Sequence, residues 1–220
     1  ATVLEGYSNT NFGSTSDMWA GYDEYLSPYG RTARSLIQFD VSTIPFGTTI
    51  SNASLRVFLV YSWDFPSTSR TITTYRPNST WSESIVTWNN HPSPVESYGS
   101  ASVTHLSWGW YSFDVTNLVQ GWVNNSIPNY GIMLRGSEQS GYDSSVRGFS
   151  TREGDYTPEL VVTYSGSTLL PGTGPGGENS LDREHAIPII EAMTGESTNW
   201  ANSCQGFLQQ QVTIKCLSYR

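Results

Sequence analysis

The chain has 220 residues, of which 14% are charged and 13% aromatic, and its formal net charge at pH 7 is −8. This acidic balance argues against a nucleic-acid partner, which needs a basic face, and no stretch is apolar for long enough to span a bilayer as a helix. The 20 glycines, 11 prolines and many Ser, Thr and Asn residues are typical of a turn-rich β-protein rather than of a disordered chain.

Alternating apolar and polar side chains predict the first strands. Short strands are expected at residues 2–4 and 18–21, and residues 34–41 alternate as a strand that is buried mainly on one face. Residues 53–61 alternate cleanly and become apolar on both faces, which is typical of a central strand in a two-layer sandwich. The inward set is Ala53, Leu55, Val57, Leu59 and Tyr61. A further strand is expected at residues 71–76.

A stretch with two tryptophans follows these strands. Thr80 and Glu83 have the spacing of a capping box, which predicts one helical turn starting at Trp81. Residues 85–88 are β-branched or aromatic and predict a short strand that ends at Trp88. We interpret this element as a corner that plugs the end of a sandwich, because such tryptophans usually fill a core. The alternative is an exposed aromatic platform for a sugar.

The next part of the chain combines one short helix with further strands. A loop interrupted by prolines is expected at residues 91–100. Thr116 is a good N-cap for a helix over residues 117–123, and Asp114 is expected to hydrogen-bond the backbone beside it. Many short strands separated by turn signals indicate an all-β sandwich over residues 1–165. The remaining strands are expected at residues 102–106, 110–115, 130–135, 146–150 and 160–164.

The chain changes character after the sandwich. Residues 166–180 form a Gly/Pro/Ser linker by composition. In the tail, residues 181–220, a short helix is expected at residues 181–193 and an amphipathic strand at residues 207–217. A piece of about 40 residues is too small to hold a core alone, so the tail must pack on its own sandwich or on a neighbouring one. The candidate subunit-contact residues are Leu208, Val212, Ile214 and Cys216.

Several features predict an oxidising, extracellular compartment. Both cysteines, Cys204 and Cys216, lie in the tail, where a disulfide would contribute roughly 3 kcal/mol; two free buried cysteines are the alternative. Ala1 fits the first residue left after removal of a signal peptide. The candidate acceptors of N-linked glycans are Asn52, Asn78 and Asn124.

Patterns for catalysis and metal binding are weak. The three histidines are scattered outside any zinc-protease or nucleophile-elbow motif, and the acidic residues near the N-terminus match no calcium loop. No Cys/His grouping predicts a zinc site. We therefore expect no enzymatic activity, no cofactor and no metal. The residues in question are His91, His105, His185, Asp17, Asp23, Glu24 and Asp40.

Aromatic side chains near strand ends and in loops are candidates for sugar binding, because exposed rings can stack on the apolar face of a sugar. The candidates are Tyr61, Trp63, Trp108 and Trp110. The structural alternative is that Tyr61 and Trp110 belong to the core and that Trp63 covers a sheet edge.

Several pieces occur in an order that resembles a known family. The string Trp-Ser-Glu-Ser-Ile-Val-Thr-Trp-Asn at residues 81–89 is similar to the central motif of secreted DNRLRE-type domains, a group related to carbohydrate-binding module family 96. The literal string Asp-Asn-Arg-Leu-Arg-Glu is absent, and the tail is unmatched. The resemblance implies a jelly-roll-like antiparallel β-sandwich of extracellular proteins, usually non-catalytic, and it fixes no ligand. Further similar pieces lie at residues 9–13, 34–40, 50–57, 113–119, 129–134 and 158–164.

Two classes of function remain. In the first, the protein is an extracellular structural subunit whose tail joins copies head-to-tail into a cell-surface fibre or similar polymer. In the second, it is a carbohydrate-binding module that attaches a cell or an enzyme to polysaccharide. We favour the structural subunit, because the module interpretation leaves the tail unexplained.

Overall fold

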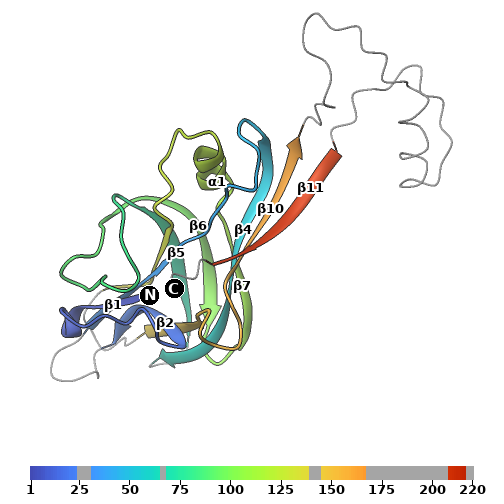
Figure 1. The fold of residues 1–220 in the computed structure, drawn as a ribbon. Helices are drawn as coiled ribbons and strands as arrows, with labels where there is room; N and C mark the ends of the chain where they lie inside the picture. Colours follow the sequence, from blue (N-terminus) through green and yellow to red (C-terminus); the bar gives the residue numbers. More distant parts are fainter. Residues whose placement is uncertain (24–30, 65–67, 139–144, 167–207, 217–220) are drawn as a thin grey trace, which may run out of the picture.

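The computed structural model describes residues 1–23, 31–64, 68–138, 145–166 and 208–216 (Figure 1). The helices are the short 3-10 helix η1 (Glu5–Tyr7) and α1 (Thr116–Val123). The strands are β1 (Thr2–Leu4), β2 (Asp17–Asp23), β3 (Arg31–Ile37), β4 (Thr49–Asp64), β5 (Ser69–Pro77), β6 (Pro94–Thr104), β7 (Gly109–Asp114), β8 (Ile132–Arg135), β9 (Ser145–Ser150), β10 (Glu159–Gly166) and β11 (Leu208–Lys215).

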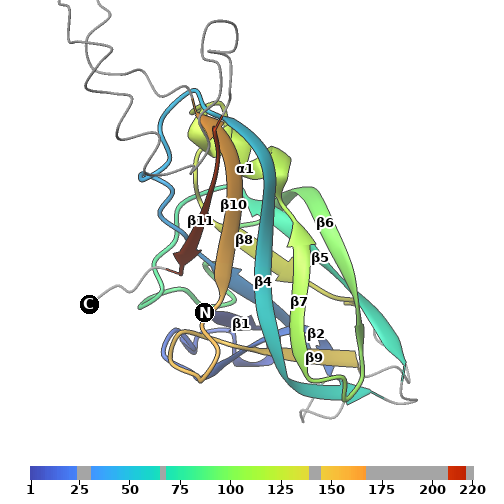
Figure 2. The ribbon, with the colours of Figure 1, turned by 90° about the vertical axis from the view of Figure 1, so that its right-hand side faces the viewer.

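The strands form one antiparallel sheet in the order β11-β10-β4-β9-β2-β3-β8-β5-β6, with β1 added to β3 and β7 added to β4. The sheet curls on itself, so that β11, β10, β4 and β7 form one layer over β3, β8, β5 and β6 (Figure 2). The main core lies between these layers and includes Leu55, Ile72, Val103 and Leu134. The predicted all-β, sandwich-like fold is confirmed.

β4 runs through the middle of this arrangement. Its inward side chains Ala53, Leu55, Val57 and Leu59 are fully buried, as the alternation predicted. A bulge between Leu59 and Tyr61 then shifts the pairing with β9. Tyr61 therefore turns outward, and its predicted place in the inward set is wrong.

The helix α1 closes one end of the sandwich, near the start of β4 (Figure 2). It begins at Thr116, one residue earlier than predicted, because Asp114 Oδ1 accepts hydrogen bonds from Thr116 N (2.9 Å) and Oγ1 (2.6 Å). The expected role of Asp114 is thus confirmed. Thr116 Oγ1 in turn accepts a hydrogen bond from Ala53 N at 2.9 Å, which ties the helix to β4.

β6 begins at Pro94, although the prolines predicted a loop through residue 100. β6 lies at an end of the strand order and pairs with β5. A proline is tolerated as the first residue of such a strand, because its missing N–H removes no ladder hydrogen bond there. The position of Pro94 at the start of an outer strand explains why the prolines wrongly predicted a loop.

The tryptophan corner is a loop that contains one hydrogen-bonded turn, in which Ile85 N and Val86 N donate to Ser82 O at 3.2 and 2.9 Å, near the predicted helical turn. The strand predicted at residues 85–88 is wrong. Asn11 Nδ2 donates to the carbonyl oxygens of Glu83 and Val86, each at 2.8 Å. Asn89 N donates to Ser8 O at 3.0 Å. The N-terminal loop thus bonds backbone groups of the corner that a neighbouring strand would otherwise pair with. These bonds hold the corner in place without a regular helix or strand.

The corner nevertheless plugs the sandwich, as we expected. Val86 is buried in a second cluster with Ala1, Val3, Leu36 and Met133, and the half-buried rings of Trp81 and Trp88 pack against it. Trp81 Nε1 donates to Tyr130 O at 2.8 Å, so its polar group is satisfied where it is partly buried.

An ion-pair network anchors the corner to β3 and β8. Arg34 binds Glu138 through Nε (2.8 Å) and Nη2 (2.9 Å), and Arg135 binds the same carboxylate. Arg34 Nη1 lies 2.8 Å from His91 Nε2, while His91 Nδ1 lies 2.6 Å from Trp88 O. Burial is the largest of the effects that lower the pKa of His91. Its neutral ring therefore accepts a hydrogen bond from Arg34 and donates one to Trp88 O.

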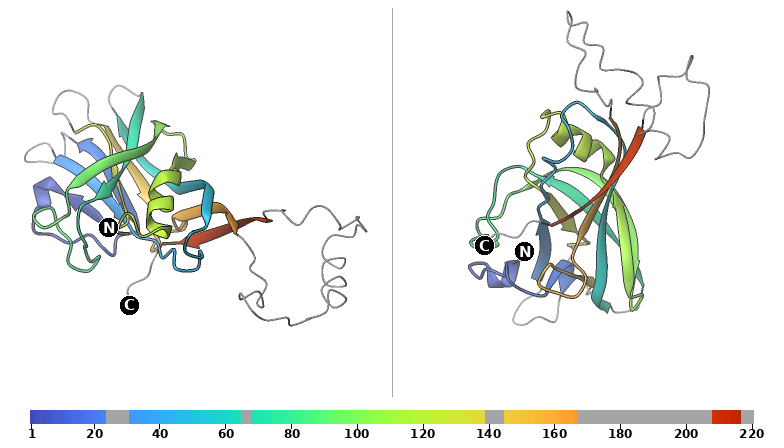
Figure 3. Two further views of the ribbon diagram at one scale, coloured as in Figure 1. Left: turned by 90° about the horizontal axis from the view of Figure 1, so that it is seen from above. Right: turned by 45° about the vertical axis from the view of Figure 1, so that its right-hand side comes forward.

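β11 completes the edge of the sheet beside β10 (Figure 3). Val212, Ile214 and Cys216 pack half-buried against the main core, while Gln209, Gln211, Thr213 and Lys215 are exposed. The predicted amphipathic strand is confirmed. In this structure the expected contact face covers the chain's own core. The pairing with β11 also satisfies a row of backbone groups that β10 would otherwise leave unpaired.

Parts of the tail predictions lie outside the described residues. These are the linker, the helix at residues 181–193, the side chain of Leu208, and Cys204. The domain boundaries and the disulfide therefore stay predictions. No helix among the described residues is long and apolar enough to cross a membrane.

The core position of Leu55 yields a stability prediction. Leu55→Ala should lower the free energy of unfolding by about 2–5 kcal/mol, because it removes a fully buried side chain from β4. Ile85→Ala, at a side chain that is 65% exposed, should change it by less than about 0.5 kcal/mol. Urea denaturation of both variants measures this, and equal effects would refute the assigned register of β4.

Glu138 yields a prediction on pH dependence. Burial tends to raise its pKa, but the hydrogen bonds and charges of Arg135 and Arg34 outweigh burial and lower the pKa to about 2. The contribution of Glu138 to stability is therefore complete above its unfolded pKa, near 4.5, and is lost as the pH falls towards 2.

Glu138→Gln should thus cost about 1–2 kcal/mol at pH 7 and much less near pH 2.5, as measured by urea denaturation at both pH values. Glu96→Gln serves as a control, since the Glu96 side chain is 58% exposed and its Oε2 lies as far as 4.0 Å from Arg76 Nε. A cost of Glu138→Gln that does not depend on pH would contradict the assigned role.

Candidate functional site

The outward face of β4 carries a row of large side chains. Because strand side chains alternate, Arg56, Phe58 and Val60 point away from the core, and Tyr61 and Trp63 follow after the bulge. Neighbouring strands and one loop add further rings to this surface, which we call the outer aromatic face. Its members are Trp19, Phe58, Tyr61, Trp63, Trp110 and Tyr156.

Three rings form a compact group beside β7. Trp110 on β7 pairs with Phe58 on β4, and their rings meet edge to face with centroids 5.5 Å apart. Tyr156, from the loop between β9 and β10, lies parallel over Phe58 at a centroid distance of 3.7 Å. Trp110 is 37% exposed and Tyr156 is 41% exposed. The sheet and the stacking therefore hold these rings in place while they face solvent.

Paired charges border this ring group. The guanidinium carbon of Arg56 lies 4.8 Å from the centroid of the Trp110 ring, and Arg56 Nη1 is 3.0 Å from Glu159 Oε2. Lys215 on β11 binds the other oxygen of Glu159. The arrangement links β7, β4, β10 and β11 across the surface. It supplies hydrogen-bonding groups beside the rings without a large field of one sign.

A second ring pair lies where β2, β9 and β4 run side by side. Trp19 and Tyr61 stack with centroids 5.6 Å apart and an interplanar angle of 17°. Both residues pair with Gly148 of β9, which lies between them and leaves the space that the rings fill. Trp19 Nε1 donates to Asp17 Oδ2 at 2.7 Å.

Tyr61 keeps its phenolic proton at neutral pH. Its pKa is raised, first because burial disfavours the phenolate and then because of the negative charges of Asp23 and Asp17. The hydroxyl group can therefore act as a hydrogen-bond donor on the outer aromatic face.

The structure brings three of the four predicted sugar-binding candidates onto this face. Tyr61, Trp63 and Trp110 are each more than a third exposed, so the alternative that Tyr61 and Trp110 belong to the core is wrong. Trp108 is 52% exposed and lies in the turn before β7. It precedes Gly109, which pairs with Leu59, and so lies at the border of the face.

Sequence reasoning missed Trp19, Phe58 and Tyr156. The outward register of Phe58 was readable from the alternation of β4. The places of Trp19 and Tyr156 on the face depend on contacts between residues far apart in the chain, and no local sequence pattern predicts such contacts.

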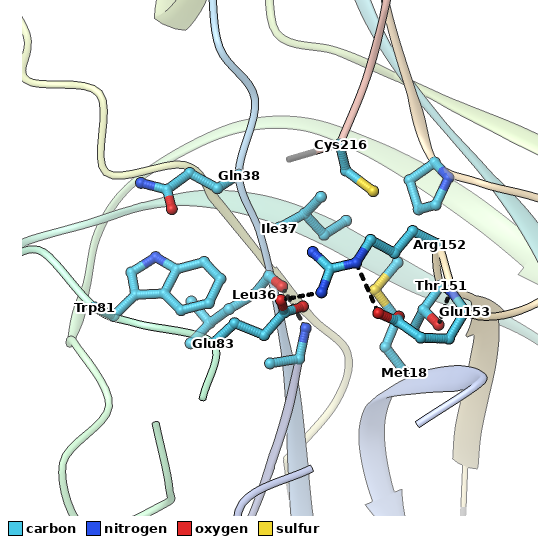
Figure 4. A pocket seen from close by; sticks show the side chains of 12 residues that line it. Met18, Leu36, Ile37, Gln38, Trp81, Glu83, Thr151, Arg152, Glu153 and Cys216 are labelled. Atoms are coloured by element: carbon cyan, nitrogen blue, oxygen red, sulfur yellow. Dashed lines mark hydrogen bonds and ion pairs between the residues drawn. The ribbon is translucent and has the colours of Figure 1, made fainter. Parts of the chain in front are cut away.

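A small pocket lies at the end of β11, and Figure 4 shows its lining. Arg152 reaches across it to Glu83 of the tryptophan corner and to Glu153, whose Oε1 is 2.7 Å away. Burial, foremost, raises the pKa of Cys216 to about 11, so its thiol stays protonated and is a weak nucleophile. The pocket thus forms a junction between β11 and the corner.

The remaining titratable candidates have structural partners. Asp40 Oδ1 accepts from Ser42 N at 2.8 Å, and Ser62 Oγ lies 3.1 Å from His105 Nδ1. Glu24 and His185 lie outside the described residues. Within the described part of the chain, no three His, Cys, Asp or Glu side chains gather in a way that could hold a metal ion.

The three candidate glycan acceptors lie at the surface. Asn52, Asn78 and Asn124 are all exposed. Asn52 pairs with Thr163 across β4 and β10, and Asn78 Oδ1 accepts from Ser93 N at 2.9 Å. Attachment of glycans at these sites stays a prediction.

Comparison with known proteins gives one family. The model described as carbohydrate-binding module family 96 matches residues 1–164. The match ends within β10, so it includes the outer aromatic face and leaves out β11. No curated protein matches the chain.

The stack of Trp19 on Tyr61 depends on Gly148, which yields a prediction. A Cβ atom at position 148 would lie 2.8 Å from Tyr61 Cβ and 3.1 Å from Trp19 Cδ1. Gly148→Ala should therefore push the rings apart, cost about 1–3 kcal/mol of stability, and change the near-ultraviolet circular dichroism. Gly47→Ala, with open space around it but a positive φ, is a control for backbone strain alone. An unchanged aromatic signal in Gly148→Ala would contradict the stacked arrangement.

Proposed function

The chain belongs to carbohydrate-binding module family 96, and from this premise we propose that its outer aromatic face binds a polysaccharide. In this role the protein attaches a cell or an enzyme to a polysaccharide outside the cell. The family is one of binding modules, which do not catalyse reactions themselves.

The observation that carries this proposal is the ring group in which the exposed Trp110 and Tyr156 pack on the half-buried Phe58. Ring faces stack on the apolar faces of sugars, and a large ring contributes binding through the area that it removes from water. The parallel stack of Tyr156 on Phe58 and the pairing of Trp110 in β7 already order these side chains. Binding therefore costs little side-chain entropy.

The shape of the face favours a polymer. The rings lie along β4 and on strands and a loop beside it, so they form an extended surface. Such a surface can contact several successive sugar units of one chain. The paired charges of Arg56, Glu159 and Lys215 can hydrogen-bond hydroxyl groups at its border.

Charge favours an uncharged polysaccharide. The net charge of −8 repels a polyanion, and the cations at the ring group, Arg56 and Lys215, both bind Glu159. We therefore expect stronger retention by neutral than by acidic polysaccharides, with a weak dependence on salt.

Substitution of the ring group tests the proposal. Trp110→Ala and Tyr156→Ala should each weaken retention on a neutral polysaccharide at least roughly tenfold, the effect of losing about 1.4 kcal/mol. Affinity electrophoresis in gels that contain single polysaccharides measures this.

Phe46→Ala is the matched control. Phe46 is 73% exposed in the turn before β4 and lines a separate depression with Trp122 and Pro128. Its loss should leave retention unchanged. If no neutral or acidic polysaccharide retains the unmodified protein, or if Phe46→Ala weakens retention as much as Trp110→Ala, the proposed face is not the binding site.

A second candidate function is that of a structural subunit in an extracellular assembly. The observation that favours it is β11, which lies beyond the family match and adds an amphipathic strand to the edge of the sheet. The ring group that carries the polysaccharide proposal lies on β4, β7 and the loop before β10, outside this strand. Electron microscopy of the native material tests this candidate, since a polymer and dispersed monomers differ in appearance.

A further inference from the structure

β11 is attached to the sheet through one neighbouring strand. Among the described strands it pairs with β10, in a register that runs from Glu159 opposite Lys215 to Gly166 opposite Leu208. Side-chain bonds add to the ladder: Gln209 Nε2 donates to Ser51 Oγ at 3.1 Å, and Lys215 binds Glu159. β11 is thus an edge strand of the sheet.

The apolar side of β11 closes the core from the outside. Val212 and Ile214 lie opposite Val162 and Leu160, which are fully buried, and pack half-buried against the main core. Cys216 reaches the junction pocket beside Arg152 (Figure 4). Without β11, this apolar strip and the free edge of β10 would both be open to solvent, which is an unfavourable state for a soluble sheet.

The chain between β10 and β11 is far longer than the pairing requires. Gly166 and Leu208 lie directly opposite each other, and two residues suffice to join antiparallel strands in a hairpin. Residues 167–207 instead connect them. Roughly 40 residues can extend to about 130 Å, whereas a domain of this size is only about 40 Å across. The connection therefore allows β11 to reach the β10 edge of a neighbouring molecule.

We propose that β11 is exchanged between copies of this chain, so that the strand of one molecule completes the sheet of the next. This inference rests on the second candidate function and names its contact surface, the β10 edge, and its partner, a second copy. Every contact of β11 described above forms equally in either arrangement. Concentration then decides the outcome, because tethering within one chain gives the strand an effective local concentration on the order of millimolar.

The exchange is heterologous, which determines its products. The strand that is donated, β11, differs from the edge that accepts it, β10. Each added copy therefore again has one β11 strand to donate and one β10 edge to accept another. Such a contact grows into an open filament unless the rotation between copies closes a ring. One edge strand can thus produce a fibre without any further interface.

A cross-linking experiment distinguishes the two arrangements. Val161 and Thr213 lie directly opposite each other on the outward side of β10 and β11. In the full chain carrying Cys204→Ser and Cys216→Ala, Val161→Cys with Thr213→Cys places one thiol on each strand at a distance suited to a disulfide. After refolding and oxidation, pairing within one chain gives a covalent monomer, and exchange gives a covalent ladder on a non-reducing gel.

We expect the ladder to rise from less than about a tenth of the protein after refolding at about 10 μM to about half at about 1 mM. The control replaces residues 167–207 by Asn-Gly, which holds β11 on its own β10 and should give monomer alone at both concentrations. Light scattering of the unmodified chain over the same range tests exchange independently of the engineered thiols.

Two results would overturn the proposal: monomers at every concentration in both measurements, or the same ladder in the Asn-Gly control. The control also separates this proposal from polysaccharide binding. It keeps the outer aromatic face, so its retention on polysaccharide should equal that of the full chain whether or not exchange occurs.

Discussion

The burial of one side of β4 is the constraint on which the rest of the structure depends. β4 is 16 residues long and pairs with β10, β7 and β9, so it connects most of one layer of the sandwich. Ala53, Leu55, Val57 and Leu59 must face the core, and the period of two then turns Arg56 and Phe58 outward. The outer aromatic face is therefore a direct consequence of how the core is filled.

This relation also explains how far the sequence could predict the molecule. Period-two alternation predicted the buried set of β4, the sandwich and the amphipathic β11, because these features depend on local pattern and on burial. The bulge after Leu59 left no such signal. There, Ser62 Oγ accepts from Leu106 N at 2.9 Å, and Tyr61 stacks on Trp19, so contacts distant in sequence set the register. The tryptophan corner was mispredicted for the same reason, since Asn11 holds its backbone from 72 residues away.

The site itself was predictable only in part. Tyr61, Trp63 and Trp110 were predicted as sugar-binding candidates because they are aromatic residues near strand ends and in loops. All three lie on one face. Tyr156 completes that face from the loop between β9 and β10, and its position depends on the pairing of both strands with β4. A surface assembled from several strands becomes visible when the sheet order is known, and local sequence patterns cannot supply that order.

The two proposed functions meet at Glu159. Its carboxylate binds Lys215 of β11 on one side and Arg56 on the other, and Arg56 lies over the ring of Trp110. A β11 strand from a neighbouring copy would bring the same Lys215 to the same Glu159, so the outer aromatic face would be built identically in a monomer and in an assembly. Copies joined by strand exchange would then present the face repeatedly along one fibre. Several weak ring contacts on one long polysaccharide would add through their high effective concentration, and assembly would strengthen binding without changing a single contact at the face.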